Sequence, residues 1–258
     1  MRIALFDSGL GGITVLKEAM HQLPSEDFLY YADTQHVPYG TKPKERVREI
    51  VFDAVEFIAR QDIKALVVAC NTATSIAVRD LRSKYNFPIV GMEPAVKPAL
   101  EVPSSQGQRI LVFATPLTLM EEKFHRLVEK IDEEHNVDFL PLPELVDFAE
   151  TFSFNESTIF PYLSHKLSKY DLTQYKAVVL GCTHFVLFKS LFRRFLPPHI
   201  HIVDGNAGTV TYLKRLLVSG GLTSNDGSGN VLFYTSGIAM EENMIERIHN
   251  DLFNLEIL

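Results

Sequence analysis

The sequence predicts an α/β protein of two similar domains, each with a mainly parallel sheet and related by internal pseudo-symmetry. Three observations support this class: strand-like and helix-like segments alternate, several strand-like segments are continuous apolar runs, and the two halves of the chain resemble one another. Alternating segments favour parallel strands joined by right-handed crossovers. Continuous apolar runs are typical of strands that are covered on both faces.

The expected elements follow from hydrophobic patterning along the chain. Strands are predicted at residues 2–6, 27–31, 64–69, 87–91, 109–114, 136–141, 177–181, 199–203 and 230–234. Helical periodicity is clearest over 44–61, where an apolar stripe runs from Val47 to Ile58. Pro43 suits the first turn of that helix. Two C-terminal helices, near 207–219 and 239–255, are expected to pack back on the first half.

Two pairs of segments indicate an internal duplication. The segment from Ala65 to Thr72 is echoed by the segment from Ala177 to His184, and the segment from Arg2 to Ser8 is echoed by the segment from Arg109 to Thr115. The two echoes are separated by similar lengths of chain, so chance similarity between short strands is the less favoured explanation.

The domain boundaries are placed from this duplication and from loop-like composition. Residues 101–107 have the composition of a linker between the two domains. Residues 204–208 are a second place where the chain could pass from one domain to the other. One domain is therefore expected to comprise residues 1–98 with 207–258, and the other residues 99–206.

Composition limits the classes of function. The chain has a net charge of −7 and no block of Lys or Arg, which argues against nucleic acid or an anionic membrane as a partner. Its two cysteines do not form the pattern of a secretory disulfide framework. The apolar N-terminal stretch is too short for a signal peptide, and no segment is long enough to span a bilayer. A cytoplasmic location is expected.

Polar clusters follow the predicted strands, where ligands of open α/β sheets bind. They are Asp7-Ser8-Gly9, Pro38-Tyr39-Gly40-Thr41, Asn71-Thr72-Ala73-Thr74, Thr115 with Thr118, and Thr183-His184. None contains Lys or Arg. A bound anion, such as a small carboxylate, would be held by hydroxyls, amides and helix N-termini.

Two familiar binding motifs are not supported. Gly9-Leu10-Gly11-Gly12 resembles a dinucleotide loop, but the third small residue of that pattern is replaced by Thr14. A tight turn with close helix packing is the favoured role of these glycines. Cys182 and His184 have the spacing of half a metal site, but no second ligand pair accompanies them.

The two cysteines are the candidate reactive groups. Cys70 and Cys182 each follow a predicted strand and precede polar residues, where a helix N-terminus would lower the pKa of a thiol from about 8.5. Two thiols facing one substrate would suit removal of a proton from one face of a carbon and its return to the other. A buried cysteine is often just a small apolar residue. A thiol redox or binding protein is a further alternative, which requires the two Cα atoms to approach within about 7 Å.

In combination, these motifs resemble glutamate racemase, of the cofactor-independent aspartate/glutamate racemase superfamily. The motifs are Phe6 to Gly12, Pro38-Tyr39-Gly40, Ala69 to Thr74 and Gly181-Cys182-Thr183-His184, in family order. The resemblance implies an active site between two α/β domains. It also implies interconversion of L- and D-glutamate for peptidoglycan without a cofactor, and a possible homodimer.

The resemblance also implies roles for particular residues. Cys70 would take the α-proton of the D-isomer and Cys182 that of the L-isomer, assisted by Asp7 and His184 respectively. The positions that match substrate contacts are Asp7, Ser8, Tyr39, Gly40, Asn71, Thr72, Thr115, Thr118, Thr183 and His184. No metal site is implied.

One auxiliary group departs from the family pattern. The family usually has Glu near the second cysteine, and Asp147 is taken as its counterpart, with Glu150 as a rival. The side-chain pocket is not resolved by sequence, so aspartate racemisation or isomerisation of another small dicarboxylate stays open.

Overall fold

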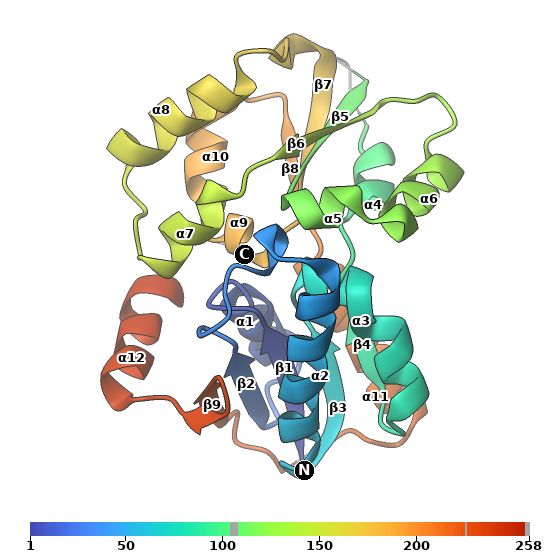
Figure 1. Ribbon diagram of the computed structural model, residues 1–258, viewed down its shortest axis with the longest axis vertical. Helices are drawn as coiled ribbons and strands as arrows, with labels where there is room; N and C mark the ends of the chain where they lie inside the picture. Colours follow the sequence, from blue (N-terminus) through green and yellow to red (C-terminus); the bar gives the residue numbers. More distant parts are fainter. Residues whose placement is uncertain (104–107, 225, 256–258) are drawn as a thin grey trace.

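The computed structural model describes residues 1–103, 108–224 and 226–255. In these residues the strands form two sheets, one above the other in Figure 1. The first has the order β10-β9-β2-β1-β3-β4 and the second β6-β5-β7-β8. Every strand pair is parallel except β10 with β9. The predicted α/β class with mainly parallel sheets is confirmed.

The strands lie close to their predicted positions. Their bounds are β1 (Arg2–Asp7), β2 (Phe28–Ala32), β3 (Ile63–Val68), β4 (Ile89–Gly91), β5 (Arg109–Ala114), β6 (Val137–Pro141), β7 (Tyr175–Leu180), β8 (His201–Asp204), β9 (Val231–Thr235) and β10 (Ile238–Ala239). The sequence did not predict β10, which has two residues and pairs with β9 after the turn at Ser236 and Gly237.

The helices connect and cover these strands. Their bounds are α1 (Ile13–Gln22), α2 (Lys44–Ala59), α3 (Asn71–Lys84), α4 (Val96–Leu100), α5 (Pro116–Met120), α6 (Glu122–Ile131), α7 (Glu144–Glu150), α8 (Glu156–Leu167), α9 (Thr183–Val186), α10 (Lys189–Phe195), α11 (Asn206–Ser219) and α12 (Glu242–Arg247). Short turns of other helix types are η1 (Tyr39–Thr41), η2 (Leu172–Gln174) and η3 (Ile248–Leu252).

Two helix predictions need correction. Pro43 is the N-cap of α2 rather than a residue of its first turn, since its ψ of 139° is extended. The helix expected over 239–255 is instead β10, α12 and the π-type turn η3. It begins later because the backbone at Glu241 is extended and residues 238–239 pair as a strand.

The duplication seen in the sequence has a structural counterpart. The central strands β1 and β5 are each flanked by the two strands that follow them in the chain, so that β2-β1-β3-β4 corresponds to β6-β5-β7-β8. Both central strands also have a register shift after their first residue, at Arg2 and at Arg109. The two sheets are therefore built on one plan.

The chain passes between the two sheets twice. Strands β1–β4, β9 and β10 form the first sheet and β5–β8 the second, and α11, after the second passage, packs against α1. The boundaries at residues 98 and 207 stay a prediction. Of the expected linker, residues 104–107 lie outside the described residues. Within the described residues, no helix is both long enough and apolar enough to cross a bilayer.

Candidate active site

The carboxyl ends of the two sheets meet through polar side chains. Asp7 is the last residue of β1, and Thr183 begins α9 directly after Cys182. The Thr183 hydroxyl donates to Asp7 Oδ1 at 3.0 Å, and the Gly9 amide donates to Oδ2 at 3.1 Å. Burial raises the pKa of Asp7 to about 6, although the nearby charge of His184 lowers it. The site therefore lies between the two sheets, closed off from solvent.

The two thiols occupy equivalent places at this junction. Cys70 is the N-cap of α3 after β3, and Cys182 precedes α9 after β7. Both are free and buried, with 5% and 7% of their surface exposed. The Ala73 amide donates to Cys70 Sγ at 3.4 Å.

The expected lowering of the thiol pKa is not found at Cys70. Burial, together with the charges of Asp7 and Cys182, raises the pKa of Cys70 to about 12. The hydrogen bonds from Ala73 and Ser8 lower it, as a helix N-terminus should, but they are smaller than the cost of removing a thiolate from water. Cys70 is therefore a protonated thiol at neutral pH in this buried position.

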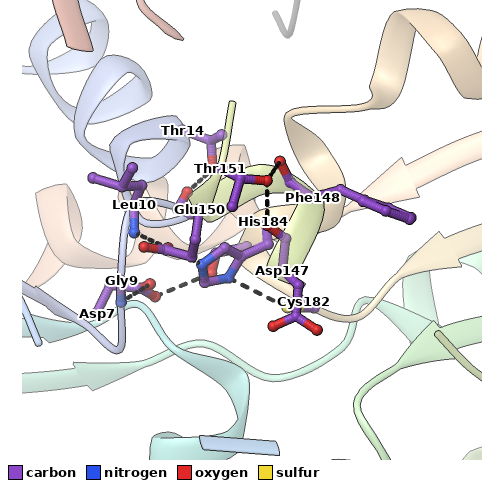
Figure 2. A network of polar contacts seen from close by, with 12 residues as sticks. Asp7, Gly9, Leu10, Thr14, Asp147, Phe148, Glu150, Thr151, Cys182 and His184 are labelled. Carbon is purple, nitrogen blue, oxygen red and sulfur yellow. Dashed lines mark hydrogen bonds and ion pairs between the residues drawn. The ribbon is translucent and has the colours of Figure 1, made fainter. Parts of the chain in front are cut away.

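His184 connects Cys182 to a carboxylate, as Figure 2 shows. Its Nδ1 lies 3.7 Å from Cys182 Sγ, and its Nε2 lies 2.7 Å from Glu150 Oε1. Burial lowers the pKa of His184, but the hydrogen bonds to Cys182 and Glu150 outweigh it and raise the pKa well above 6.5. The imidazole therefore lies between Cys182 Sγ and the Glu150 carboxyl group, and these two contacts favour its protonated form.

The carboxylate at this position is Glu150, not Asp147. Both residues lie on α7, but Asp147 is exposed, and within the described residues its carboxylate makes no hydrogen bond or ion pair with His184. Glu150 is the last residue of the helix, and its Oε1 also accepts from the Leu10 amide at 2.6 Å. The geometry therefore favours Glu150, which the sequence analysis gave as the alternative to Asp147.

Three threonine hydroxyls form a triangle across the two sheets. Thr72 Oγ1 lies 3.0 Å from Thr115 Oγ1 and 2.9 Å from Thr118 Oγ1, and the last two are 3.0 Å apart. Thr72 belongs to α3, whereas Thr115 caps α5 and Thr118 lies within it. The cluster is a compact set of hydrogen-bond groups without a formal charge.

The Tyr39–Thr41 turn lies beside this triangle. A Cβ added at Gly40 would lie 2.3 Å from Thr115 Cβ, so only glycine allows the turn to approach this closely. The Tyr39 hydroxyl is directed elsewhere, because it donates to Asp33 Oδ2 at 2.6 Å. Of this expected pair, the structure brings Gly40 to the threonines and turns the Tyr39 hydroxyl toward Asp33.

Asn71 presents an unused hydrogen-bond acceptor. Its Nδ2 donates to the Met92 carbonyl at 3.3 Å, while its buried Oδ1 has no partner among the described residues. A buried polar atom without a partner is costly unless a ligand supplies one. The amide is therefore suited to accept a hydrogen bond from a bound molecule.

The glycines of the loop after β1 lie directly against side chains of the second half of the chain. A Cβ added at Gly9 would lie 2.1 Å from Glu150 Oε1, and one added at Gly11 would lie 2.6 Å from His184 Nδ1. These glycines let the first sheet's loop pack directly against Glu150 and His184. The described residues also contain no group of three His, Cys, Asp or Glu side chains arranged to hold a metal ion.

Sequence reasoning missed Asp33. This buried carboxylate comes directly after β2, as Asp7 ends β1, and it accepts from Tyr39. An acidic residue after a buried strand was the available signal.

Comparison with known proteins identifies the family. Residues 14–213 match the Asp/Glu/Hydantoin racemase family. The chain belongs to this family. It is 58% identical to glutamate racemase of Halothermothrix orenii over 238 residues, which cover 92% of this chain and 93% of the relative.

Solved structures of family members have the same fold. Glutamate racemase of Thermus thermophilus in complex with β-chloro-D-alanine superposes with a TM-score of 0.80 at 30% identity, covering 97% of this chain and 92% of that one. The Escherichia coli glutamate racemase, in complex with L-glutamate and the activator UDP-MurNAc-Ala, gives 0.81 at 29% identity and covers 95% and 94%. The racemase resemblance and the isomerase class predicted from the sequence are confirmed.

Proposed function

We propose that the protein interconverts L- and D-glutamate by proton transfer between two thiols, without a cofactor. The observation that carries the proposal is the equivalent placement of Cys70 after β3 and Cys182 after β7, in two sheets built on one plan whose carboxyl ends meet. The relatives named above are glutamate racemases, which supports glutamate as the substrate.

Each thiol serves one face of the substrate carbon. Cys70 takes the α-proton of D-glutamate, Cys182 takes that of L-glutamate, and the opposite thiol returns a proton. The burial that raises the pKa of Cys70 also makes its thiolate a stronger base once it forms. Such basicity is useful because the α-proton of an amino acid is only weakly acidic.

Neighbouring groups adjust the two thiols differently. Asp7 acts beside Cys70, whose pKa its charge raises. The imidazole of His184 contacts Cys182 Sγ, and Glu150 holds that imidazole in place. We assign the auxiliary role to Glu150 instead of Asp147 because of this contact.

The substrate is held by neutral groups. The hydroxyls of Thr72, Thr115 and Thr118 are suited to donate to a carboxylate, and the free Oδ1 of Asn71 to accept from the ammonium group. The Thr183 hydroxyl, which donates to Asp7 at 3.0 Å, is a further hydrogen-bond group of the site. Hydrogen bonds to charged groups contribute about 1.5–3 kcal/mol each. Preorganised donors also stabilise the charge that develops on the substrate carboxylate as the proton leaves.

In the cell, this reaction would supply D-glutamate for peptidoglycan. The resemblance to glutamate racemases supports that role, and a cytoplasmic site of action follows from it, since the precursors of the wall are made there. A homodimer remains a prediction.

The test is substitution of each cysteine. We expect Cys70→Ala and Cys182→Ala each to abolish racemisation of both enantiomers, followed by circular dichroism of the amino acid, with the unfolding temperature retained. Cys70→Ser and Cys182→Ser should also lose most activity, because a hydroxyl is a far weaker acid than a thiol. A near wild-type rate in either Ala variant, or a strict requirement for pyridoxal phosphate, would refute the two-thiol reaction. Faster turnover of aspartate than glutamate would reassign the substrate.

A further inference from the structure

We propose that Asp33 is a positioning residue for substrate binding, which fixes the Tyr39–Thr41 turn against Thr115 with help from Ser236 of the C-terminal hairpin. The inference rests on the proposed racemisation of glutamate, since it assigns a function to a group behind the substrate pocket.

Asp33 is a buried hub, with 2% of its surface exposed. Its carboxylate accepts from the Tyr39 hydroxyl at 2.6 Å and from the Ser236 hydroxyl at 2.9 Å, and His36 Nδ1 lies 2.9 Å from Oδ2. Its amide donates to the Asp7 carbonyl at 3.0 Å. Three side chains therefore converge on one carboxylate whose backbone is tied to the end of β1.

The position of Tyr39 is transmitted to the hydroxyl triangle through Gly40. Gly40 is the next residue in the turn, and it packs so closely on Thr115 that no side chain would fit between them. Thr115 in turn lies 3.0 Å from Thr72 and from Thr118. Well-packed contacts pass on small displacements because they leave no free volume to absorb them. Release of Tyr39 from Asp33 would therefore loosen the wall on which the threonine hydroxyls are arranged.

Ser236 brings the C-terminal hairpin into this arrangement. It lies between β9 and β10, and its φ of 44° is a left-handed conformation that is uncommon for serine. This backbone is held by a bond from the Ser236 amide to the Ala32 carbonyl at 2.9 Å, and its hydroxyl also accepts from the Gln35 amide at 3.0 Å. Backbone strain of this kind persists where surrounding contacts fix it. The hairpin thus serves the substrate site although it lies beyond residues 14–213, which match the family.

The experiment compares three variants and one control. Asp33→Asn keeps the size of the side chain but weakens it as an acceptor, Ser236→Ala removes one donor, and Tyr39→Phe removes another while keeping the ring. Thr235→Ala is the matched control, because its hydroxyl contacts Thr34 and lies on the same hairpin, one residue away. The readouts are KM and kcat for both enantiomers, the unfolding temperature, and amide hydrogen exchange in residues 39–41.

We expect Asp33→Asn and Ser236→Ala to raise KM for both enantiomers, by about tenfold for Asp33→Asn, with a much smaller change in kcat. Amide exchange in residues 39–41 should quicken in both, and Thr235→Ala should leave KM and exchange unchanged. Adding Tyr39→Phe to Asp33→Asn should change KM little beyond the single variant, because the same link is already broken.

Unchanged KM and exchange in Ser236→Ala and Asp33→Asn would overturn the proposal, as would a lowered unfolding temperature with wild-type kinetics. A loss of kcat at unchanged KM would also overturn it, because that result would mean that Asp33 acts on the proton-transfer step and not on substrate binding. If the wild-type protein does not racemise glutamate, the proposed function fails, while the exchange measurement still tests the anchoring of the turn.

Discussion

His184 and Glu150 meet where the two halves of the chain are in contact: the imidazole Nε2 lies 2.7 Å from Glu150 Oε1, and that same oxygen accepts from the Leu10 amide of the first sheet's loop. The carboxylate therefore orients the imidazole beside Cys182 and also ties the two halves of the site together. We therefore expect a substitution of this single glutamate, at the end of α7, to disturb both contacts.

We predict that Glu150→Gln lowers kcat by about tenfold to a hundredfold, because a hydrogen bond to a charged group is replaced by a weaker neutral one. The loss should exceed any change in KM. Steady-state kinetics in both directions would measure it.

Asp147→Asn is the matched control on the same helix. Because Asp147 is exposed, we expect its kinetics to stay near those of the wild type. A loss of activity in Asp147→Asn with none in Glu150→Gln would restore the assignment expected from the sequence.

Asp7→Asn should stabilise the protein near neutral pH while lowering its activity. The folded protein binds the Asp7 proton more tightly than the unfolded chain does, since the pKa is about 6 against 3.8. The stability contributed by that proton is present below pH 3.8 and is lost as the pH rises to about 6. Asparagine avoids the cost of the buried charge.

Thermal unfolding at several pH values would check this prediction. The unfolding temperature of Asp7→Asn should exceed that of the wild type at about pH 7.5, and the difference should shrink as the pH falls towards about 4. A difference that is constant, or that grows in acid, would contradict the raised pKa.

Gly40→Ala should reduce kcat/KM strongly, by about tenfold or more, because the new methyl group would overlap Thr115 and force the two halves apart. Gly208→Ala is the control: it lies in α11, where an added Cβ meets no atom within 4 Å. That change should raise stability by about 0.5–1 kcal/mol through helix propensity and leave the kinetics alone. Equal kinetics in the two variants would show that the turn need not approach Thr115.

Removal of one hydroxyl from the triangle should weaken substrate binding. Thr118→Val keeps the shape of the side chain, and we expect KM to rise by about tenfold, in line with the loss of a hydrogen bond to a carboxylate. Thr118→Ser keeps the hydroxyl and should retain most of the affinity. If Thr118→Ser were impaired as much as Thr118→Val, the methyl group would matter and the hydroxyl would not.

The fold was largely predictable because the strands at the centre of each sheet, β1, β3, β5 and β7, are buried along almost their whole length. Hydrophobic patterning, with continuous apolar runs at several strands, located β1 to β9 within a few residues, and the duplication in sequence corresponds to the matching order of the two sheets. The C-terminal region was harder. There a left-handed turn at Ser236 creates a hairpin, and the pattern of apolar residues does not predict such a turn.

The candidate site was predictable where residues with reactive side chains directly follow a predicted strand. Cys70, Cys182 and His184 each follow a buried strand, so their residue types and positions sufficed to propose them. The choice between Asp147 and Glu150 depends on how α7 is turned relative to α9, which is a tertiary property. The role of Asp33 depends on Ser236, which is 203 positions away in the chain. The high pKa of Cys70 likewise reflects how tightly the closed site excludes water.

Because both thiols are buried, the proposed enzyme would keep, after each turnover, the protonation state that its last substrate left behind. A turnover that consumes D-glutamate leaves Cys70 protonated and Cys182 ionised, which is the form that accepts L-glutamate. Because both sulfurs are nearly closed to water, this form returns to the other only as fast as the site exchanges protons with solvent. At high concentrations of one enantiomer, resetting the empty enzyme would then limit turnover in place of the chemistry on carbon.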